Sequence, residues 1–302
     1  MIRTPRFTAR LCLLIAALFA FAQFLSAQDE NEVIKVESAT VLINTTVFDR
    51  DGKAVGGLAR DQFSVFENGT RQEISYFSAA DTPFAAVILI DSSGSMESRI
   101  SMARAAAINF LDGIRESDNV AIYRFASKVE LVQDFSGSRD ISERIFDIKA
   151  DGMTALNDSI FKAAEQLKNR EEKRRAIVVL SDGEDTFSGR SADRALRAAL
   201  EAGALIYTID MSAIEDSSRR RMQNQGVLKN FAEKSGGRFI ATPAGAALRE
   251  AFKTIVEELG VQYTLGYEPI DQKKDGKWRA IEVRSARPNL TIRARKGYTA
   301  AK

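Results

Sequence analysis

The hydrophobic pattern of the chain contains short apolar runs, each followed at once by polar residues. Residues 85–90 and 176–180 are unbroken runs rich in β-branched side chains, and 205–209 is a similar segment. Such runs are typical of strands buried on both faces of a parallel sheet. Apolar residues at helical spacing occur in 100–114, 155–168 and 246–259. This alternation, from about 84 to 259, predicts an α/β fold with a doubly wound, mostly parallel sheet.

The segments on either side of this α/β region have a pattern typical of strands. Residues 33–80 are rich in β-branched and aromatic side chains and contain Asn68-Gly69, a pair typical of a tight hairpin turn. In the tail, apolar and polar residues alternate in 280–283 and 290–294. The first of these segments is too small to hide much apolar surface alone. We therefore expect the two segments to pair as a small antiparallel β domain into which the α/β domain is inserted.

The first 27 residues have the pattern of a secretory signal peptide. Three arginines without any acidic residue precede an apolar segment, Leu11 to Leu25, that is short for a membrane span. Small residues allow cleavage after Ala22 or Ala27, and an uncleaved membrane anchor is the alternative. The only cysteine, Cys12, lies in this segment, so the mature chain has no disulfide. These features predict an exported protein, either periplasmic or secreted.

Four segments follow from these patterns. They are a signal peptide at 1–27, a β segment at 28–82, the α/β domain at 83–260 and a second β segment at 261–302.

Charge and composition exclude several classes of function. Without the three arginines of the signal, 40 basic residues stand against 41 acidic ones, so no basic surface for nucleic acid or an anionic membrane is expected. The chain has no histidine, which removes Ser-His-Asp triads, histidine bases and nearly every zinc site. Any metal must then be held by oxygen, as Mg²⁺, Mn²⁺ and Ca²⁺ are.

Oxygen-bearing side chains occur on three loops of the α/β region. Asp91, Ser93 and Ser95 follow the strand at 85–90, Thr154 precedes the helix at 155–168, and Asp182 follows the strand at 176–180. The carboxyl ends of parallel strands meet at one edge of a sheet, where ligands bind in open α/β folds. Two carboxylates and three hydroxyls there suit Mg²⁺ and leave a coordination position for an outside carboxylate.

These residues resemble the metal-ion-dependent adhesion site of the von Willebrand factor type A domain. Asp91-x-Ser93-x-Ser95, Thr154 and Asp182 match that motif in order and context, over a resemblance that covers about 84–259. The resemblance implies Mg²⁺ or Mn²⁺, ahead of Ca²⁺, and a partner protein whose acidic residue completes the coordination. It also implies one short antiparallel edge strand, for which Lys128–Val132 is the candidate. The flanking segments, with Gly297-Tyr298, resemble those of exported bacterial proteins with a related domain.

Other polar residues near these loops have two interpretations each. Glu184 and Asp185 either form a second ion site or belong to a solvated loop. Asp158 either orients a hydroxyl of the site or lies on the helix surface. Trp278, the only tryptophan, is expected in the core of the β domain rather than at a ligand platform.

The sequence therefore predicts a binding module rather than an enzyme. We expect a metal-dependent adhesion or interaction domain of an exported bacterial protein, which binds no nucleic acid and contacts a membrane only through an uncleaved anchor. One alternative is an assembly factor of the cell envelope that uses the same site. The other is a Mg²⁺-dependent hydrolase, against which the lack of histidine weighs. The sequence leaves the oligomeric state open.

Overall fold

The computed structural model describes residues 40–79, 82–137, 142–212, 218–241 and 245–301. The predicted signal peptide at 1–27 and the start of the first β segment lie outside the described residues. Within the described ranges, no helix is long and apolar enough to cross a membrane.

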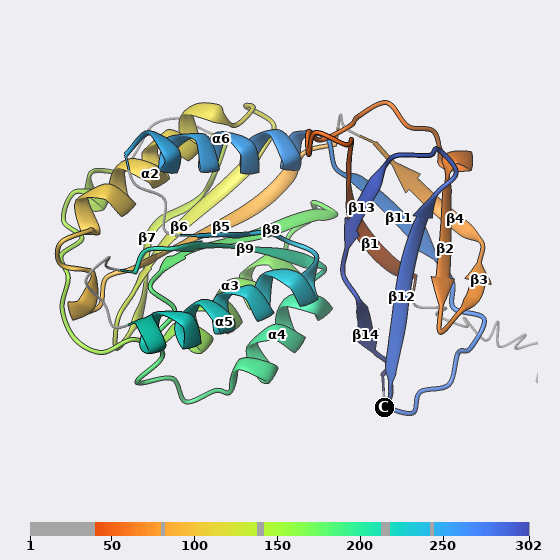
Figure 1. Cartoon of the computed structure of the whole chain (residues 1–302). Helices are drawn as coiled ribbons and strands as arrows, with labels where there is room; N and C mark the ends of the chain where they lie inside the picture. Colours follow the sequence, from red (N-terminus) through yellow and green to blue (C-terminus); the bar gives the residue numbers. More distant parts are fainter. Residues whose placement is uncertain (1–39, 80–81, 138–141, 213–217, 242–244, 302) are drawn as a thin grey trace, which may run out of the picture. The chain divides into compact units, whose positions relative to one another are not determined.

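The central element is a six-stranded sheet with the strand order β10-β9-β8-β5-β6-β7 (Figure 1). All neighbouring pairs are parallel except β6 and β7. The strands are β5 (Phe84–Asp91), β6 (Asn119–Phe125), β7 (Val129–Ser136), β8 (Arg174–Ser181), β9 (Ala204–Asp210) and β10 (Phe239–Ile240). The mixed α/β architecture predicted from the sequence is thus confirmed, and the antiparallel edge strand β7 includes most of the segment expected for it.

Helices cover both faces of this sheet. They are α2 (Ile100–Gly113), α3 (Leu156–Lys168), α4 (Ala192–Glu201), α5 (Ser218–Ser235) and α6 (Ala246–Gly260). Ile88 and Ile90 of β5 pack in one core with α2 and α6, whereas Val87 and Leu89 pack in a second core with α3, α4 and α5. Successive side chains of a strand point to opposite faces, so β5 must be apolar at every position to fill both cores.

The segments before and after the α/β unit form two four-stranded sheets, ordered β13-β1-β11-β4 and β14-β12-β2-β3. Their strands are β1 (Val41–Phe48), β2 (Phe63–Glu67), β3 (Thr70–Gln72), β4 (Ile74–Ser78), β11 (Tyr263–Tyr267), β12 (Trp278–Ser285), β13 (Thr291–Ala294) and β14 (Gly297–Thr299). Early and late segments pair directly, β1 with β11 and β2 with β12, all antiparallel. Val65 of one sheet and Tyr263 of the other belong to a shared core. At the β2–β3 hairpin, Asn68 and Gly69 both have positive φ, as a tight primed turn requires.

Trp278 does not lie in the core of the β unit, so that prediction was wrong. The side chain is 46% exposed, whereas its neighbour Arg279 is 4% exposed. Because side chains alternate along β12, only one of the two can point inward. Arg279 takes the inward position, where its guanidinium pairs with Asp271 at 3.4 Å and Asp275 at 3.1 Å.

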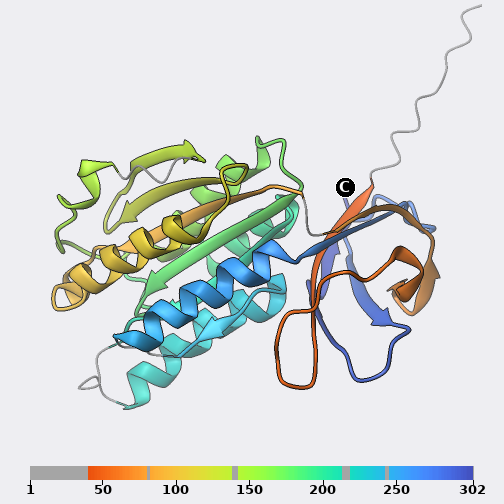
Figure 2. The same cartoon turned by 90° about the horizontal axis from the view of Figure 1, so that it is seen from above.

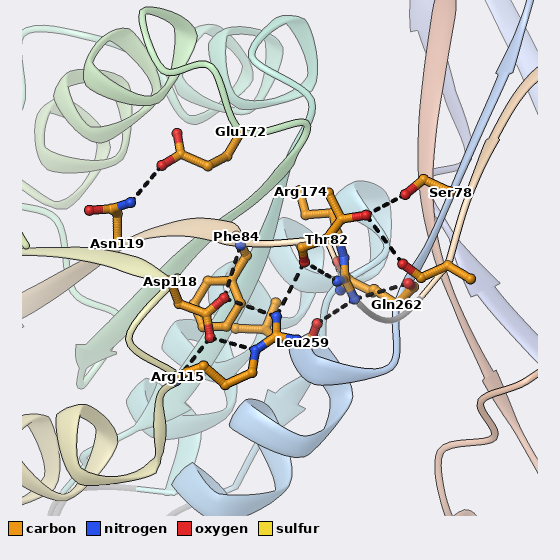
Figure 3. A network of polar contacts seen from close by, with 11 residues as sticks. Ser78, Thr82, Phe84, Arg115, Asp118, Asn119, Glu172, Arg174, Leu259 and Gln262 are labelled. Carbon is orange, nitrogen blue, oxygen red and sulfur yellow. Dashed lines mark hydrogen bonds and ion pairs between the residues drawn. The ribbon is translucent and has the colours of Figure 1, made fainter. Parts of the chain in front are cut away.

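A fully buried arginine joins the two connections between the α/β unit and the β unit (Figure 3). Arg174, the first residue of β8, donates to the carbonyls of Thr82, Leu259 and Gln262, the latter two at 2.6 and 2.9 Å. Thr82 lies on the connection into β5, and Leu259 and Gln262 lie where α6 leads into β11. Both connections are therefore fixed at the amino-terminal end of β8.

Candidate functional site

The first loop of the candidate site follows β5. Asp91, the last residue of the strand, is fully buried, and its Oδ1 accepts a hydrogen bond from the Ser93 N–H at 2.9 Å. This local bond turns the chain into a 3₁₀ turn at Gly94–Met96, so that α2 begins only at Ile100. The Ser93 and Ser95 hydroxyls lie 3.2 Å apart. The alternating Asp-x-Ser-x-Ser spacing thus gathers these oxygens on one side of the turn.

The second loop lies directly against the first. The Asp151 N–H donates to the Ser92 carbonyl at 2.8 Å, and the Gly94 N–H donates to the Gly152 carbonyl at 3.1 Å. Thr154, which is 3% exposed, comes two residues later, just before α3 begins at Leu156. The backbone bonds therefore place Thr154 beside the serine turn.

The third loop follows β8 and is bonded to both of the others. The Ser181 hydroxyl donates to Asp91 Oδ2 at 2.6 Å, and the N–H groups of Thr186 and Phe187 both donate to the Thr154 carbonyl at 2.9 Å. Asp182 is 5% exposed, and its Oδ1 accepts the Glu184 N–H at 3.0 Å. The three loops thus form one hydrogen-bonded cluster at the carboxyl edge of the sheet, and they bring the predicted residues together.

The turn after Asp182 requires a glycine. Gly183 has φ of 83°, and a Cβ there would lie 2.6 Å from the Asn224 carbonyl and 2.9 Å from Leu228. Its N–H donates to the Ser181 hydroxyl at 3.0 Å. Gly183 therefore lets the chain turn sharply beneath α5 while Ser181 and Asp182 stay beside Asp91.

The two carboxylates are buried without a positive partner. No lysine or arginine among the described residues forms an ion pair with Asp91 or Asp182; the polar contacts found for the two carboxylates are hydroxyl and backbone N–H groups. The pKa of Asp91 is raised to about 7, mainly by burial and to a smaller extent by the negative charge of Asp182, while hydrogen bonds from Ser181 and Ser93 act to lower it. Buried charges in proteins are normally paired or bound to a metal.

The donor set fits a hard divalent cation. Its five oxygen groups are two carboxylates and three hydroxyls, on Asp91, Ser93, Ser95, Thr154 and Asp182. Mg²⁺ and Mn²⁺ prefer such oxygen ligands, and Mg²⁺ readily keeps water in its remaining positions. The described residues contain no group of three or more His, Cys, Asp or Glu side chains arranged for a metal, so an ion held here depends on the hydroxyls.

The other acidic residues considered from the sequence brace the loops. Asp158 accepts the N–H groups of Gly189 and Arg190 at 3.0 and 3.1 Å, and it contacts no hydroxyl of the site. Asp185 accepts the Asn157 N–H at 2.8 Å, and Glu184 pairs with an arginine of α5. Their oxygens are thus engaged in holding the loops, which does not favour a second ion site.

Sequence reasoning assigned no role to Ser181 or Thr186. Ser181 bonds Asp91 across the strands, and the Thr186 hydroxyl accepts the Thr154 N–H at 3.0 Å. For Ser181 a signal was available, because it directly precedes Asp182 at the end of a buried strand. Thr186 gave no such signal, since its contact depends on how the loop folds.

Two exposed apolar side chains lie beside Thr154. Met153 precedes it in the chain and is 48% exposed, and Phe187, whose N–H bonds the Thr154 carbonyl, is 49% exposed. Exposed apolar side chains that lie together within a polar rim are a feature of interaction surfaces, whereas single ones are common on any protein.

Comparison with known proteins identifies the class of domain. Residues 86–184, which include the five predicted site residues, match the family model of the von Willebrand factor type A domain. This part of the chain is therefore similar to a von Willebrand factor type A domain.

Individual relatives are more distant. The chain is 25% identical over 215 residues to a UPF0353 protein of Nocardia farcinica, a match covering 60% of this chain and 64% of that protein. The pilus adhesin SpaC of Lactobacillus rhamnosus GG superposes with a TM-score of 0.50 at 10% identity, over 82% of this chain and 49% of SpaC. A von Willebrand factor type A protein of Catenulispora acidiphila superposes with a TM-score of 0.49 at 12% identity, over 87% of this chain and 75% of that protein. The chain thus spans less than two thirds of the Nocardia protein, and the likeness to SpaC shows the fold alone.

Proposed function

We propose that this protein is a divalent-cation-dependent protein-binding module. The observation that carries the proposal is the pair of buried carboxylates, Asp91 and Asp182, which have hydroxyl neighbours and no cationic side chain among their described contacts. A divalent ion there would neutralise the charge that burial leaves uncompensated.

The proposed ligands are Asp91, Ser93, Ser95, Thr154 and Asp182, with Mg²⁺ or Mn²⁺ as the ion and Ca²⁺ as the weaker choice. Two carboxylates balance the charge of a divalent ion, and neutral hydroxyls leave it electrophilic toward a further oxygen. The ion would supply an attachment point for an external carboxylate. The Asp or Glu side chain of a partner protein fits that position, and Met153 and Phe187 would contact apolar residues next to it.

The acidic residues next to the site favour a binding function over catalysis, because they are not free to act as a base. A hydrolase would need a base, and the chain has no histidine. Glu184 is paired with an arginine, and both oxygens of Asp185 accept backbone N–H groups. An exported location, cleavage of residues 1–27 and a role in adhesion or envelope assembly belong to the same proposal, and the shared fold of a pilus adhesin is in keeping with it.

Metal binding is tested by thermal unfolding in EDTA and then in Mg²⁺ or Mn²⁺. A ligand that binds only the folded state adds about 2.7 kcal/mol at 100 times its dissociation constant. We expect such a gain in the wild type and in Asp151→Asn, whose exposed carboxylate lies on the second loop. The gain should vanish in Asp91→Asn. An equal gain in Asp91→Asn would refute the assignment of this site.

Partner chemistry is tested by peptide display on the immobilised protein. One library carries a fixed central Asp and the other a fixed central Asn, and selections are made in Mg²⁺ and in EDTA. Enrichment confined to the Asp library in Mg²⁺ supports carboxylate binding. Metal-independent enrichment of both libraries would contradict it.

A further inference from the structure

A cavity of about 370 Å³ lies at the opposite end of the sheet from the candidate cation site. Its walls come from the amino-terminal end of β8, the connection from α4 to β9, and strands β1 and β14. Strands β8 and β9 are parallel, so the cavity lies at their amino ends and the cation site at their carboxyl ends. The two sites are therefore structurally independent.

The charges lining this cavity are strongly one-sided. Four of the residues that line the cavity are cationic, Lys173, Arg175, Arg197 and Arg295, and one, Glu201, is acidic. None of the four forms an ion pair within the described part of the chain. The cavity thus concentrates positive charge that the described residues leave unbalanced.

Arg295 is the residue on which the site depends. Its side chain is only 9% exposed, and one terminal nitrogen donates to the Leu200 carbonyl at 3.0 Å. Its Nε is buried and has no hydrogen-bond partner among the described residues. The guanidinium also lies over the Tyr298 ring, with 5.7 Å to the ring centroid. A buried arginine without a carboxylate partner is costly unless an anion compensates it.

Neighbouring groups complete a cradle for an anion. Arg175 is held by the Glu172 and Ala202 carbonyls at 2.7 and 2.8 Å, so its position is fixed. Lys173 and Arg197 are exposed, and neither forms an ion pair with another described residue. Ligand pockets typically begin at about 300 Å³, so the volume of this cavity is sufficient for a small organic ion.

We propose that this cavity binds a small anion carrying a phosphate or carboxylate group. The guanidinium of Arg295 would receive the anionic oxygens at depth, as arginine does in planar phosphate and carboxylate recognition. Lys173 and Arg197 would add charge at the mouth. The ligand would contact both the α/β unit and strands of the β unit, so binding would stabilise their association.

The test uses the purified protein in EDTA, with inorganic phosphate, glycerol phosphate and citrate as separate probes. Sodium chloride at matched ionic strength corrects for general screening. Binding is followed by thermal unfolding and calorimetry. The double variant Lys173→Gln/Arg197→Gln removes the charge at the mouth without disturbing any buried group. Lys162→Gln/Arg144→Gln removes the same charge from exposed positions elsewhere.

We expect at least one probe to stabilise the wild type and the control double variant alike. Affinity should fall about tenfold in Lys173→Gln/Arg197→Gln, equivalent to ~1.4 kcal/mol. Tighter binding of the phosphate probes would identify a phosphate group as the ligand, and tighter binding of citrate would identify a carboxylate. Equal affinity in both double variants, or no stabilisation by any probe beyond that of chloride, would overturn the proposal. Arg295→Met, where it folds, should lose binding altogether.

Discussion

Replacement of Asp91 by asparagine should stabilise the metal-free protein near neutral pH. Asp91 is fully buried, and its pKa is raised from 3.8 to about 7, chiefly by burial. Between these two values the folded protein keeps a proton that the unfolded chain has lost. Stability therefore falls as pH rises through this window, and the loss is complete above the folded-state pKa.

The size of the effect follows from the shift. A change of about three pH units corresponds to roughly 4 kcal/mol, an upper value because the loops around Asp91 can relax in the charged state. Asparagine mimics the protonated carboxyl in shape and carries no charge. Its Oδ1 can still accept the Ser93 N–H, and its amide can donate to the Ser181 hydroxyl, which is free to rotate.

Urea unfolding in EDTA at pH 5, 6, 7 and 8 measures this difference. Over this pH range the free energy of unfolding of the wild type should fall by up to about 1.4 kcal/mol per pH unit. The Asp91→Asn protein should show a flatter profile and be the more stable of the two at pH 8. Asp151→Asn, an exposed carboxylate on the next loop, should follow the wild type. Parallel profiles for wild type and Asp91→Asn would refute the reasoning. In Mg²⁺ the order should reverse, because only the wild type gains the ion.

Three further substitutions test separate parts of the structure. Gly183→Ala should cost about 1–3 kcal/mol in urea unfolding and weaken Mg²⁺ binding, whereas Gly52→Ala, with positive φ but open space, should cost less. Arg174→Met removes the donor to the buried carbonyls of Leu259 and Gln262, whereas the Thr82 carbonyl keeps its hydrogen bond from Arg115; the variant should cost about 3 kcal/mol or more in urea unfolding. Phe187→Gln should preserve Mg²⁺ affinity but reduce recovery of Asp-containing peptides in display; Phe146→Gln, exposed elsewhere, should not.

The parts of the fold that the sequence predicts well are those in which local pattern and burial coincide. The apolar run of β5 predicts a central strand because helices cover both faces of this strand. The Asp-x-Ser-x-Ser motif brings its oxygens together through a local hydrogen bond, from the Ser93 N–H to Asp91. Trp278 shows where this reasoning fails. Alternation along β12 allows either Trp278 or Arg279 to face inward, and the choice depends on acids of the preceding loop that only the folded chain brings close.

The burial of two arginines could not be predicted from the sequence pattern either. Charged residues are rarely buried, so Arg174 and Arg295 gave no sequence signal for the interior. The burial of each depends on backbone carbonyls of distant segments: those of Thr82 and Gln262 accept from Arg174, and that of Leu200 accepts from Arg295. Such convergence exists only after the chain has folded.

The β unit is joined to the α/β unit at the end of the sheet opposite the candidate cation site. The chain enters the α/β unit at the start of β5 and leaves it after α6, at the same end of the sheet (Figure 2). Arg174, at the amino-terminal end of β8, binds both connections (Figure 3). Strands β5 and β8 are parallel, so their carboxyl ends with Asp91 and Asp182 lie at the other end of the sheet. An insertion attached at one end of its sheet leaves the opposite end open to a partner. Strands β1 and β14 of the β unit also form one wall of the cationic cavity. The place where the β unit is attached thus puts the candidate cation site and the cationic cavity at opposite ends of the sheet.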